Sequence, residues 1–301
     1  MLATNSKIST HVSRCGGTVG TRQWQSLTVV YETCGQGQPV LLLPAFSTVS
    51  SRAEMEPLAT QLAAHFQVTV LDWPGFGDSD RPPLDYCPEL YHPFLADFVR
   101  SHFTAPIIVI AAGHAAGYAL QLAATHPQTC SKLVLVAPTW RGPLAVMGVP
   151  PAIRKGVKAL VRSPLLGQAL YGLNTRPSFL KWMYRRHVFV DDSQLTPAYL
   201  EQRYQNTQKP GGRYAPAAFV TGSLDPVQTR AEFLAYLEKL TLPLMVVVAE
   251  QAPTASKAEM EAIAALAPVQ VGRLPGTLGM AEEYGNEVAE QILPFLQGVA
   301  D

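Results

Sequence analysis

Two glycines frame the position in this chain that is best placed to do chemistry. Residues 113–117 read Gly-His-Ala-Ala-Gly. They lie between an apolar, β-branched run at 106–111, which predicts a buried strand, and an Ala/Leu-rich stretch at 115–126, which predicts a helix. A Gly-x-Ser-x-Gly frame at such a junction is the pattern of a nucleophile elbow, whose glycines allow a sharp turn and whose middle residue points into the site. Here the middle residue is Ala115, and a methyl group cannot attack a carbonyl carbon.

Strands and helices alternate on both sides of this turn. Apolar runs predict further strands at 28–32, 39–43, 68–71, 132–136, 242–248 and 269–274. Two Ser-x-x-Glu motifs predict capping boxes at helix starts, at 51–54 and 256–259, and a last helix is expected at 287–296. The alternation predicts an α/β fold with a mostly parallel, doubly wound sheet.

A loop rich in Gly, Pro and Asp follows the predicted strand at 68–71. It reads Asp-Trp-Pro-Gly-Phe-Gly-Asp-Ser-Asp-Arg-Pro at 72–82. This loop closely resembles the D-x-P-G-F-G-x-S-D-x-P loop of the α/β-hydrolase superfamily, and the 113–117 turn resembles that superfamily's G-H-S-x-G elbow. The resemblance implies an α/β-hydrolase fold with an inserted helical cap. It divides the chain into a flexible tail at residues 1–22, a core formed by residues 23–139 and 217–301, and a cap at residues 140–216.

Acyl transfer on this scaffold needs a nucleophile, an acid and a histidine in that chain order. By the resemblance, the acid follows the strand at 242–248, where Ala252 stands, and the histidine lies five residues before Glu283, where Leu278 stands. The last of the seven histidines is His187, so no register places one after the final strand. The resemblance therefore implies a catalytically degenerate member, whose Ser, acid and His slots hold Ala115, Ala252 and Leu278.

Several other residues are weaker candidates for chemistry. The backbone N–H groups of Phe46 and Ala116 occupy the oxyanion positions of the superfamily. His114 is expected to have a supporting, structural role. Asp225 lies in a Gly-Ser-Leu-Asp-Pro stretch that resembles an acid loop, so it is either a relocated acid or, as favoured here, a turn or helix-capping residue. Glu250 is expected to be a solvated loop residue.

The charges are balanced overall but distributed unevenly. The 301 residues include 23 Lys and Arg and 23 Asp and Glu, so net charge favours neither nucleic acid nor membrane as a partner. No acidic residue occurs between Asp97 and Asp191, which makes the predicted cap cationic. Apolar residues interleave with its bases, so the cap either binds an anionic membrane surface or an acidic protein, or presents an ordinary solvated face. The candidate binding residues are Arg154, Lys155, Lys158, Arg162, Arg185 and Arg186. No nucleic-acid-binding module is present.

The cysteines and the N-terminus bear on the cellular compartment. The four cysteines lie far apart in the sequence and lack metal-ligand spacing; they are Cys15, Cys34, Cys87 and Cys130. This pattern predicts free thiols in a reducing, cytoplasmic compartment, and no metal or other cofactor. No apolar run reaches the length of a membrane span, and residues 1–22 lack the apolar region of a secretory signal. Those residues contain bases and hydroxyls but no acid, so plastid import is an alternative to a plain flexible tail.

Three function classes follow from these observations. The apolar triad slots favour a non-catalytic binding or scaffolding protein with a basic cap. A first alternative is an esterase-like hydrolase or lyase that uses His114, Asp225 or Glu250. A second alternative is a small-molecule binder whose apolar pocket lies over the three empty slots and takes a small apolar ligand.

Overall fold

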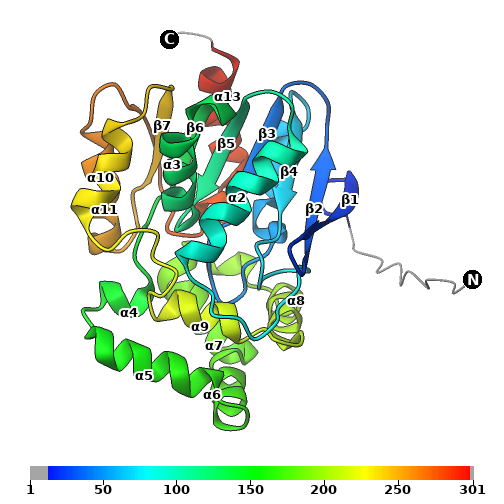
Figure 1. Cartoon of the computed structure of the whole chain (residues 1–301), viewed down its shortest axis with the longest axis vertical. Helices are drawn as coiled ribbons and strands as arrows, with labels where there is room; N and C mark the ends of the chain where they lie inside the picture. Colours follow the sequence, from blue (N-terminus) through cyan, green and yellow to red (C-terminus); the bar gives the residue numbers. More distant parts are fainter. Residues whose placement is uncertain (1–12, 299–301) are drawn as a thin grey trace, which may run out of the picture.

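Eight strands form one sheet in the computed structural model, which describes residues 13–298 (Figure 1). The strand order is β1-β2-β4-β3-β5-β6-β7-β8. The β1–β2 and β2–β4 pairs are antiparallel and the other five pairs are parallel. The predicted mostly parallel sheet is therefore confirmed. The strands are β1 (Thr18–Trp24), β2 (Leu27–Cys34), β3 (Pro39–Leu43), β4 (Gln67–Leu71), β5 (Ile107–Ala112), β6 (Cys130–Val136), β7 (Leu244–Ala249) and β8 (Gln270–Leu274).

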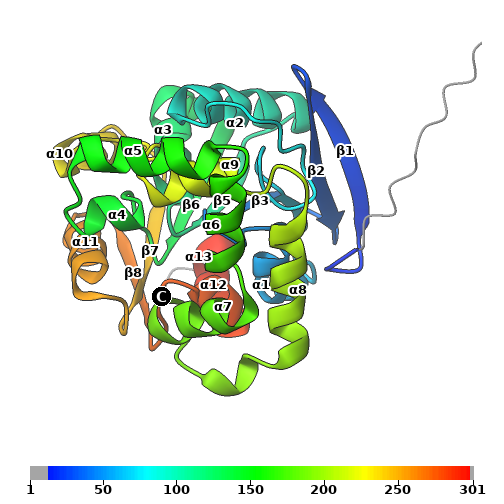
Figure 2. The same cartoon turned by 90° about the horizontal axis from the view of Figure 1, so that it is seen from below.

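Helices cover both faces of the sheet. On one face α1 packs against α13, and on the other α3 packs against α2 and α10 (Figures 1 and 2). The central strands are consequently buried on both sides, and no residue of β5 is more than 3% exposed, which is why its sequence reads as an unbroken apolar run. These helices are α1 (Glu56–Leu62), α2 (Pro88–His102), α3 (Ala115–Thr125), α10 (Arg230–Glu238), α11 (Thr254–Ala264), α12 (Met280–Glu283) and α13 (Gly285–Gln297).

Six more helices lie between β6 and β7, beneath the end of the sheet at which β5 and β6 finish (Figure 1). We call residues 143–220 the cap segment. Its helices are short, and several begin with proline, which ends the preceding helix and favours a new start. They are α4 (Pro143–Val146), α5 (Pro151–Arg162), α6 (Leu166–Asn174), α7 (Pro177–Met183), α8 (Pro197–Gln208) and α9 (Tyr214–Val220). Four short turns of 3₁₀ or π type complete the structure: η1 (Arg52–Met55), η2 (Pro127–Thr129), η3 (Tyr184–Val188) and η4 (Asp192–Gln194).

The flexible tail predicted for residues 1–22 is wrong in its second part. Residues 1–12 lie outside the described residues, but Thr18–Trp24 is strand β1, paired along its whole length with β2. The backbone N–H groups of Arg14 and Cys15 donate to the Glu32 carboxylate at 2.8 and 2.9 Å. Only Trp24 is buried in β1, so the strand has little hydrophobic pattern and is held by its backbone ladder.

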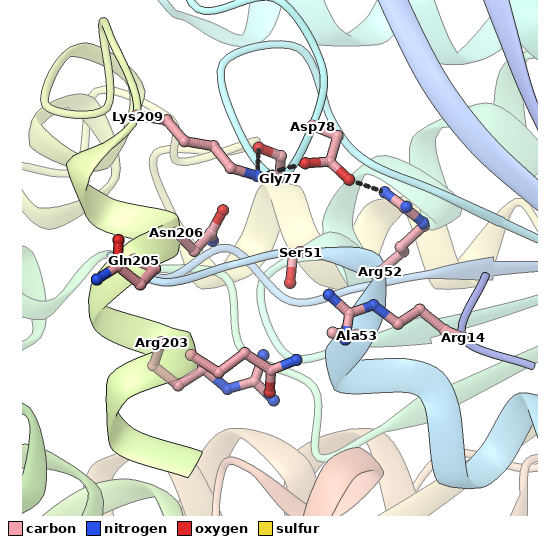
Figure 3. A pocket seen from close by; sticks show the side chains of 11 residues that line it. Arg14, Ser51, Arg52, Ala53, Gly77, Asp78, Arg203, Gln205, Asn206 and Lys209 are labelled. Atoms are coloured by element: carbon pink, nitrogen blue, oxygen red, sulfur yellow. Dashed lines mark hydrogen bonds and ion pairs between the residues drawn. The ribbon is translucent and has the colours of Figure 1, made fainter. Parts of the chain in front are cut away.

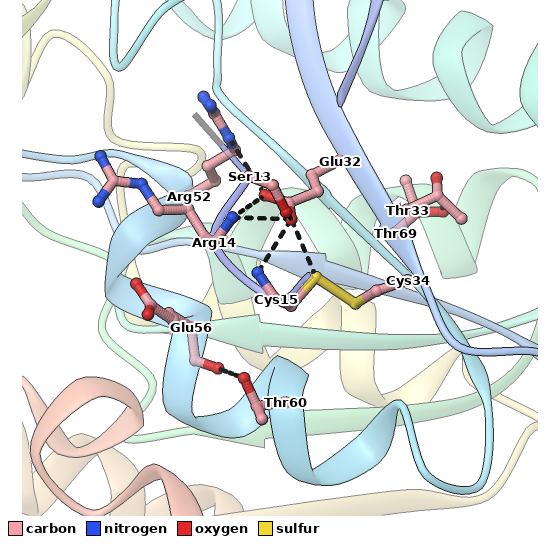
Figure 4. Close-up of a disulfide and its surroundings, with 10 residues drawn as sticks. All are labelled: Ser13, Arg14, Cys15, Glu32, Thr33, Cys34, Arg52, Glu56, Thr60 and Thr69. Atoms are coloured by element: carbon pink, nitrogen blue, oxygen red, sulfur yellow. Dashed lines mark hydrogen bonds and ion pairs between the residues drawn. A yellow bond between two sulfur atoms is a disulfide. The ribbon is translucent and has the colours of Figure 1, made fainter. Parts of the chain in front are cut away.

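Cys15 and Cys34 form a disulfide, with Cα atoms 6.2 Å apart (Figure 4). The prediction of free thiols is therefore wrong for this pair and confirmed for Cys87 and Cys130. The two linked cysteines are 19 residues apart in the sequence, but the antiparallel register of β1 and β2 returns the chain to the same edge of the hairpin. Disulfides are rare in reducing compartments, so the cysteines no longer support a cytoplasmic location.

Neither predicted capping box forms. Ser51 precedes η1 without a side-chain hydrogen bond to the helix backbone, and the Glu54 carboxylate accepts from the Ser47 hydroxyl instead, at 3.4 Å. Ser256 lies inside α11, which begins two residues earlier at Thr254. Glu54 is buried, and its carboxylate bonds the Ser47 hydroxyl there.

None of the helices in residues 13–298 combines the length and the apolar character needed to cross a bilayer.

Candidate active site

The two glycines of the predicted elbow lie at the junction of β5 and α3, but the sharp turn comes before the predicted middle residue. Gly113 follows β5 with φ of +50°, in the left-handed region, whereas Ala115 is already the first residue of α3 and has no exposed surface. A Cβ atom on Gly117 would lie 2.2 Å from Cγ of Pro226, so this glycine lets α3 pack closely on the chain around residue 226. The N–H of Ala116, a predicted oxyanion donor, donates to the Gly113 carbonyl oxygen at 3.2 Å and closes the turn.

The other two triad slots lie at the same edge of the sheet. Ala252 is buried in the turn after β7, where its N–H donates to the Ala249 carbonyl oxygen at 3.2 Å. Leu278 is half-buried in the loop between β8 and α12. The residues on either side of Leu278 tie this loop to the cap segment, because the Thr277 hydroxyl and the Gly279 N–H both donate to the Val188 carbonyl oxygen.

His114 and Asp225, 111 positions apart in the numbering, come together beside the elbow. The His114 Nε2 atom lies 3.5 Å from Asp225 Oδ1 and 2.9 Å from the carbonyl oxygen of Leu224. The two side chains belong to residues that are 1% and 5% exposed. Of the turn or helix-capping role favoured for Asp225, the structure has a turn, since its N–H donates to the Gly222 carbonyl oxygen at 3.4 Å. Its Oδ1 accepts from the Gly142 N–H at 2.7 Å and so joins two loops. No pattern in the sequence predicts this contact between His114 and Asp225.

Burial pushes both groups toward their uncharged forms. Loss of hydration lowers the pKa of His114 to about 4, although its contact with the Leu224 carbonyl opposes that change. Loss of hydration also raises the pKa of Asp225 to about 7, against the hydrogen bond from Gly142 and the charge of Arg154. His114 is therefore neutral at physiological pH and is a weak base.

Aromatic side chains surround the imidazole. The His114 ring lies edge-on to Phe46 and Phe219, with ring centroids 5.9 and 5.3 Å away, and Phe46 stacks on Trp73 at 4.9 Å. Phe46, the other predicted oxyanion residue, is thus 3% exposed and packs its side chain in the core. The surroundings of His114 fit a structural histidine better than a general base.

Glu250 belongs to a surface ion-pair cluster. Its carboxylate lies 2.7 Å from Lys257 Nζ and 2.8 Å from a guanidinium nitrogen of Arg273. Hydrogen bonds from these two residues lower the pKa of Glu250. The group is exposed enough for solvent and salt to screen it, so it stabilises the loop after β7 only slightly.

A cavity of about 310 Å³ lies between η1 and α8 (Figure 3). Arg52, which is 3% exposed, pairs there with Asp72 and Asp78, and its Nε lies 3.7 Å from Glu32. Burial raises the pKa of Asp78, but hydrogen bonds and charge from Lys209 and Arg52 outweigh burial and lower it well below its usual range. The network joins the hairpin, η1 and the loop after β4.

A second buried network borders the same cavity. Arg203 of α8 pairs with Glu282 of α12, whose carboxylate also accepts from the Tyr199 hydroxyl at 2.8 Å. Burial raises the pKa of nearby Glu54 to about 7, although the charge of Arg203 lowers it. Sequence reasoning identified none of these groups, because their partners come from distant segments. None of the three triad-slot residues lines this cavity.

The sequence over residues 38–278 matches the model of the alpha/beta hydrolase fold family. The chain belongs to the alpha/beta hydrolase fold family. It is 25% identical over 108 residues to the 2-hydroxy-6-oxo-6-(2'-aminophenyl)hexa-2,4-dienoic acid hydrolase of Metapseudomonas resinovorans, a match that covers 35% of this chain and 37% of that relative.

Solved structures show the same fold at low sequence identity. Cfl2 from Burkholderia cenocepacia superposes with a TM-score of 0.72 at 21% identity, over 94% of this chain and 97% of that one. The enol-lactonase from Burkholderia xenovorans LB400 superposes with a TM-score of 0.68 at 15% identity, over 92% and 100%. At these identities the likeness of this alpha/beta hydrolase fold protein to solved structures concerns architecture alone.

The basic residues predicted as a binding surface are largely engaged. Arg154 donates to the carbonyl oxygens of Val149 and Thr221 at 3.0 and 2.9 Å, and Lys158 lies 2.7 Å from Asp85. Arg162 donates to the carbonyl oxygens of residues 83 and 84. These three side chains line a cavity of about 460 Å³ between α5 and residues 221–223 of this alpha/beta hydrolase fold protein.

The remaining predicted bases are exposed. Lys155 is exposed on α5, Arg185 pairs with Asp192 at 2.8 Å, and Arg186 lies over the Trp182 ring, 5.8 Å from its centroid. Of the four candidate binding residues on α5, only Lys155 is exposed. Three of the four hold the helix to the body of the protein.

Proposed function

We propose that this member of the alpha/beta hydrolase fold family works by binding rather than by acyl transfer. One observation carries the proposal: the residues that the superfamily resemblance assigns to the three catalytic positions are Ala115, Ala252 and Leu278, none of which has a side-chain group that can act as nucleophile, acid or base. The nearest histidine in sequence, His114, holds a carbonyl oxygen through Nε2 and has a lowered pKa.

Turnover of a panel of activated esters by the purified protein tests this proposal. We expect rates equal to those in buffer and no labelling by a serine-directed fluorophosphonate. Ala115→Ser should not restore activity, because a serine without base and acid gains little. Saturable turnover that a point change at the elbow abolishes would overturn the proposal.

The second candidate is a hydrolase or lyase that uses non-standard residues. Its support is the contact between His114 and Asp225, whose pKa of about 7 would suit a general acid. Against it, Asp225 is 5% exposed and its Oδ1 already accepts the Gly142 N–H. If the panel shows turnover, Asp225→Asn discriminates: a loss of kcat with unchanged KM favours this candidate.

The apolar-pocket alternative has weaker support. The two cavities of about 310 and 460 Å³ are lined mainly by charged and polar residues, and neither is lined by a triad-slot residue. A small apolar ligand bound over Ala115 would raise the melting temperature, and a screen of such ligands by thermal shift tests it.

A further inference from the structure

Large apolar side chains are exposed almost only on the cap segment. Ten such residues are exposed within residues 13–298; nine lie between positions 146 and 190, and Val271 is the other. Leu165, Met147 and Leu166 are 85%, 74% and 65% exposed. Soluble proteins usually scatter exposed apolar residues singly, so their concentration on one segment indicates an interaction surface. We call the following set the apolar patch: Met147, Ile153, Leu160, Leu165, Leu166, Leu173 and Trp182.

Five members of the patch lie on α5, α6 and α7, and the other two, Met147 and Leu165, lie directly after α4 and directly before α6. These four successive helices pack each against the next. The contacts run from α4 to α5, from α5 to α6 and from α6 to α7. Figure 2 views the molecule from the cap side, and it shows these helices in front of the sheet. The helices that carry the patch therefore lie at one end of the molecule, opposite to the end where α13 finishes (Figure 1).

Helix α5 buries bases as well as apolar residues. Arg154, Lys158 and Arg162 repeat every four residues, so they share one face, and that face is bonded to the body of the protein. Val157 and Val161 are half-buried with them, whereas Ile153 and Leu160, seven residues apart, are 57% and 44% exposed. An ordinary surface helix buries its apolar stripe and exposes its charges. In α5 the bases take up part of the buried face, so the side that carries Ile153 and Leu160 is left exposed.

The charge around the patch is positive. No Asp or Glu occurs from residue 98 to residue 190. Lys155, Arg176, Lys181 and Arg186 are exposed on or beside the helices that carry the patch. Two copies of this chain that met through their patches would bring like charges together, which disfavours self-association. An anionic surface is complementary to both features at once.

We propose that the exposed faces of α4 to α7 dock the protein on an anionic lipid bilayer. The inference rests on the proposed binding role, whose partner it names. Apolar side chains that project this far insert into the boundary between headgroups and acyl chains, about 5–10 Å deep. Lys155, Arg176 and Lys181 are exposed on or next to α5 and α7 and supply positive charge for anionic headgroups. A fluid bilayer closes around projecting residues such as Leu165 and Leu166, whereas a protein partner must offer matching pockets.

Vesicle flotation of the full chain tests the proposal. Vesicles of phosphatidylcholine with phosphatidylserine should carry the wild-type protein upward, and vesicles of phosphatidylcholine alone should carry much less. Leu165→Ser with Leu166→Ser should weaken the partition coefficient about tenfold or more, because two exposed leucines lose their insertion. The matched control is Val271→Ser, which removes an exposed apolar residue outside the patch and should float like wild type.

Tryptophan emission gives an independent readout. Three of the four tryptophans are buried, at 9%, 0% and 4% exposure for Trp24, Trp73 and Trp140, whereas Trp182 of the patch is 51% exposed. Added anionic vesicles should shift the emission to shorter wavelength, and brominated lipid should quench it. Trp182→Phe should abolish both changes and leave flotation within about twofold of wild type, because phenylalanine also inserts.

The charge contribution is tested with Lys155→Glu and Lys181→Glu together. Both lysines are exposed, so the variant should fold normally and bind anionic vesicles about tenfold more weakly. Absence of flotation, or equal flotation of the serine variant, overturns the proposal. A dimer in sedimentation experiments that the serine variant converts to a monomer, without flotation, also overturns it and identifies the patch as a self-association surface.

The same preparations separate this inference from the proposed function. Ester turnover is measured with and without vesicles. Turnover together with flotation refutes the non-catalytic role and leaves membrane docking in place. Absence of ester turnover together with absence of flotation refutes membrane docking and leaves the non-catalytic role in place.

Discussion

Replacing Gly117 by alanine should destabilise the protein, although alanine is the better helix former. The added Cβ would lie 2.2 Å from Cγ and 2.9 Å from Cβ of Pro226. Carbon atoms prefer a separation of about 3.5–4.0 Å, so the proline ring must move by about 1.3 Å. The residue two positions before the ring, Leu224, accepts hydrogen bonds from His114 and Tyr118 at 2.9 and 2.8 Å, which restrains that movement.

The magnitude follows from three contributions. Overpacking of this kind costs about 1–3 kcal/mol, and a strained buried hydrogen bond costs about 1 kcal/mol more. The helix propensity of alanine returns up to about 1 kcal/mol. We therefore expect Gly117→Ala to lower the free energy of unfolding by about 2 kcal/mol, and Gly117→Val to lower it further.

Gly156→Ala is the matched control, because a Cβ there meets no atom within 4 Å. The same substitution in α5 should raise the free energy of unfolding by about 0.5–1 kcal/mol. Urea denaturation of both variants and wild type measures the two effects. If Gly117→Ala gained stability as Gly156→Ala does, close packing of α3 on Pro226 would be the wrong description of the elbow.

Two further predictions concern stability. The unfolded chain ionises Asp225 above about pH 4, whereas the folded protein keeps this proton up to about pH 7, so Asp225 lowers the free energy of unfolding as pH rises through this range. The pKa of His114 is lowered in the folded protein, so His114 lowers the free energy of unfolding as pH falls from about 6.5 to 4. As pH rises from about 4.5 to 6.5, the free energy of unfolding of Asp225→Asn should increase relative to wild type by about 1.4 kcal/mol per pH unit, and that of His114→Gln should decrease by a similar amount. Urea denaturation across this range measures both differences, and variants whose free energies of unfolding ran parallel to wild type would contradict the burial of the pair. Reduction of the Cys15–Cys34 disulfide should lower the free energy of unfolding by about 3 kcal/mol, measured with and without dithiothreitol, and Cys15→Ser should then be insensitive to the reductant.

The central sheet was predictable because burial on both faces leaves a simple pattern. Strands such as β5 and β7 consist of six buried residues each, and their sequences contain no polar position that a helix or a surface strand would need. Strand β1 was missed for the opposite reason. It lies at the edge of the sheet and buries only Trp24, so its pairing with β2 leaves almost no trace in the hydrophobic pattern.

The polar contacts could not be predicted from the sequence for a different reason. Each joins segments that are far apart in the sequence, and sequence separation does not tell which distant segments meet in the fold. Asp225 meets His114 because the loop before residue 226 folds over the elbow, and Arg203 meets Glu282 because α8 reaches α12. The assignment of the triad positions to Ala115, Ala252 and Leu278 stays a prediction, because it rests on the superfamily resemblance and on the residue types read at those places.

The orientation of α5 shows the limit of periodicity most clearly. Its sequence separates a basic row from an apolar row, but periodicity does not say which row faces the protein. In the structure the three bases bond acceptors elsewhere in the chain. Arg154 donates to the Thr221 carbonyl oxygen, Lys158 to the Asp85 carboxylate and Arg162 to the Leu84 carbonyl oxygen. Bases held in this way contribute little to binding an outside partner, and two residues of the apolar row, Ile153 and Leu160, are exposed while Val157 and Val161 are half-buried. Membrane association through this helix should therefore depend more on Leu160 and its apolar neighbours, and less on salt, than the count of bases suggests.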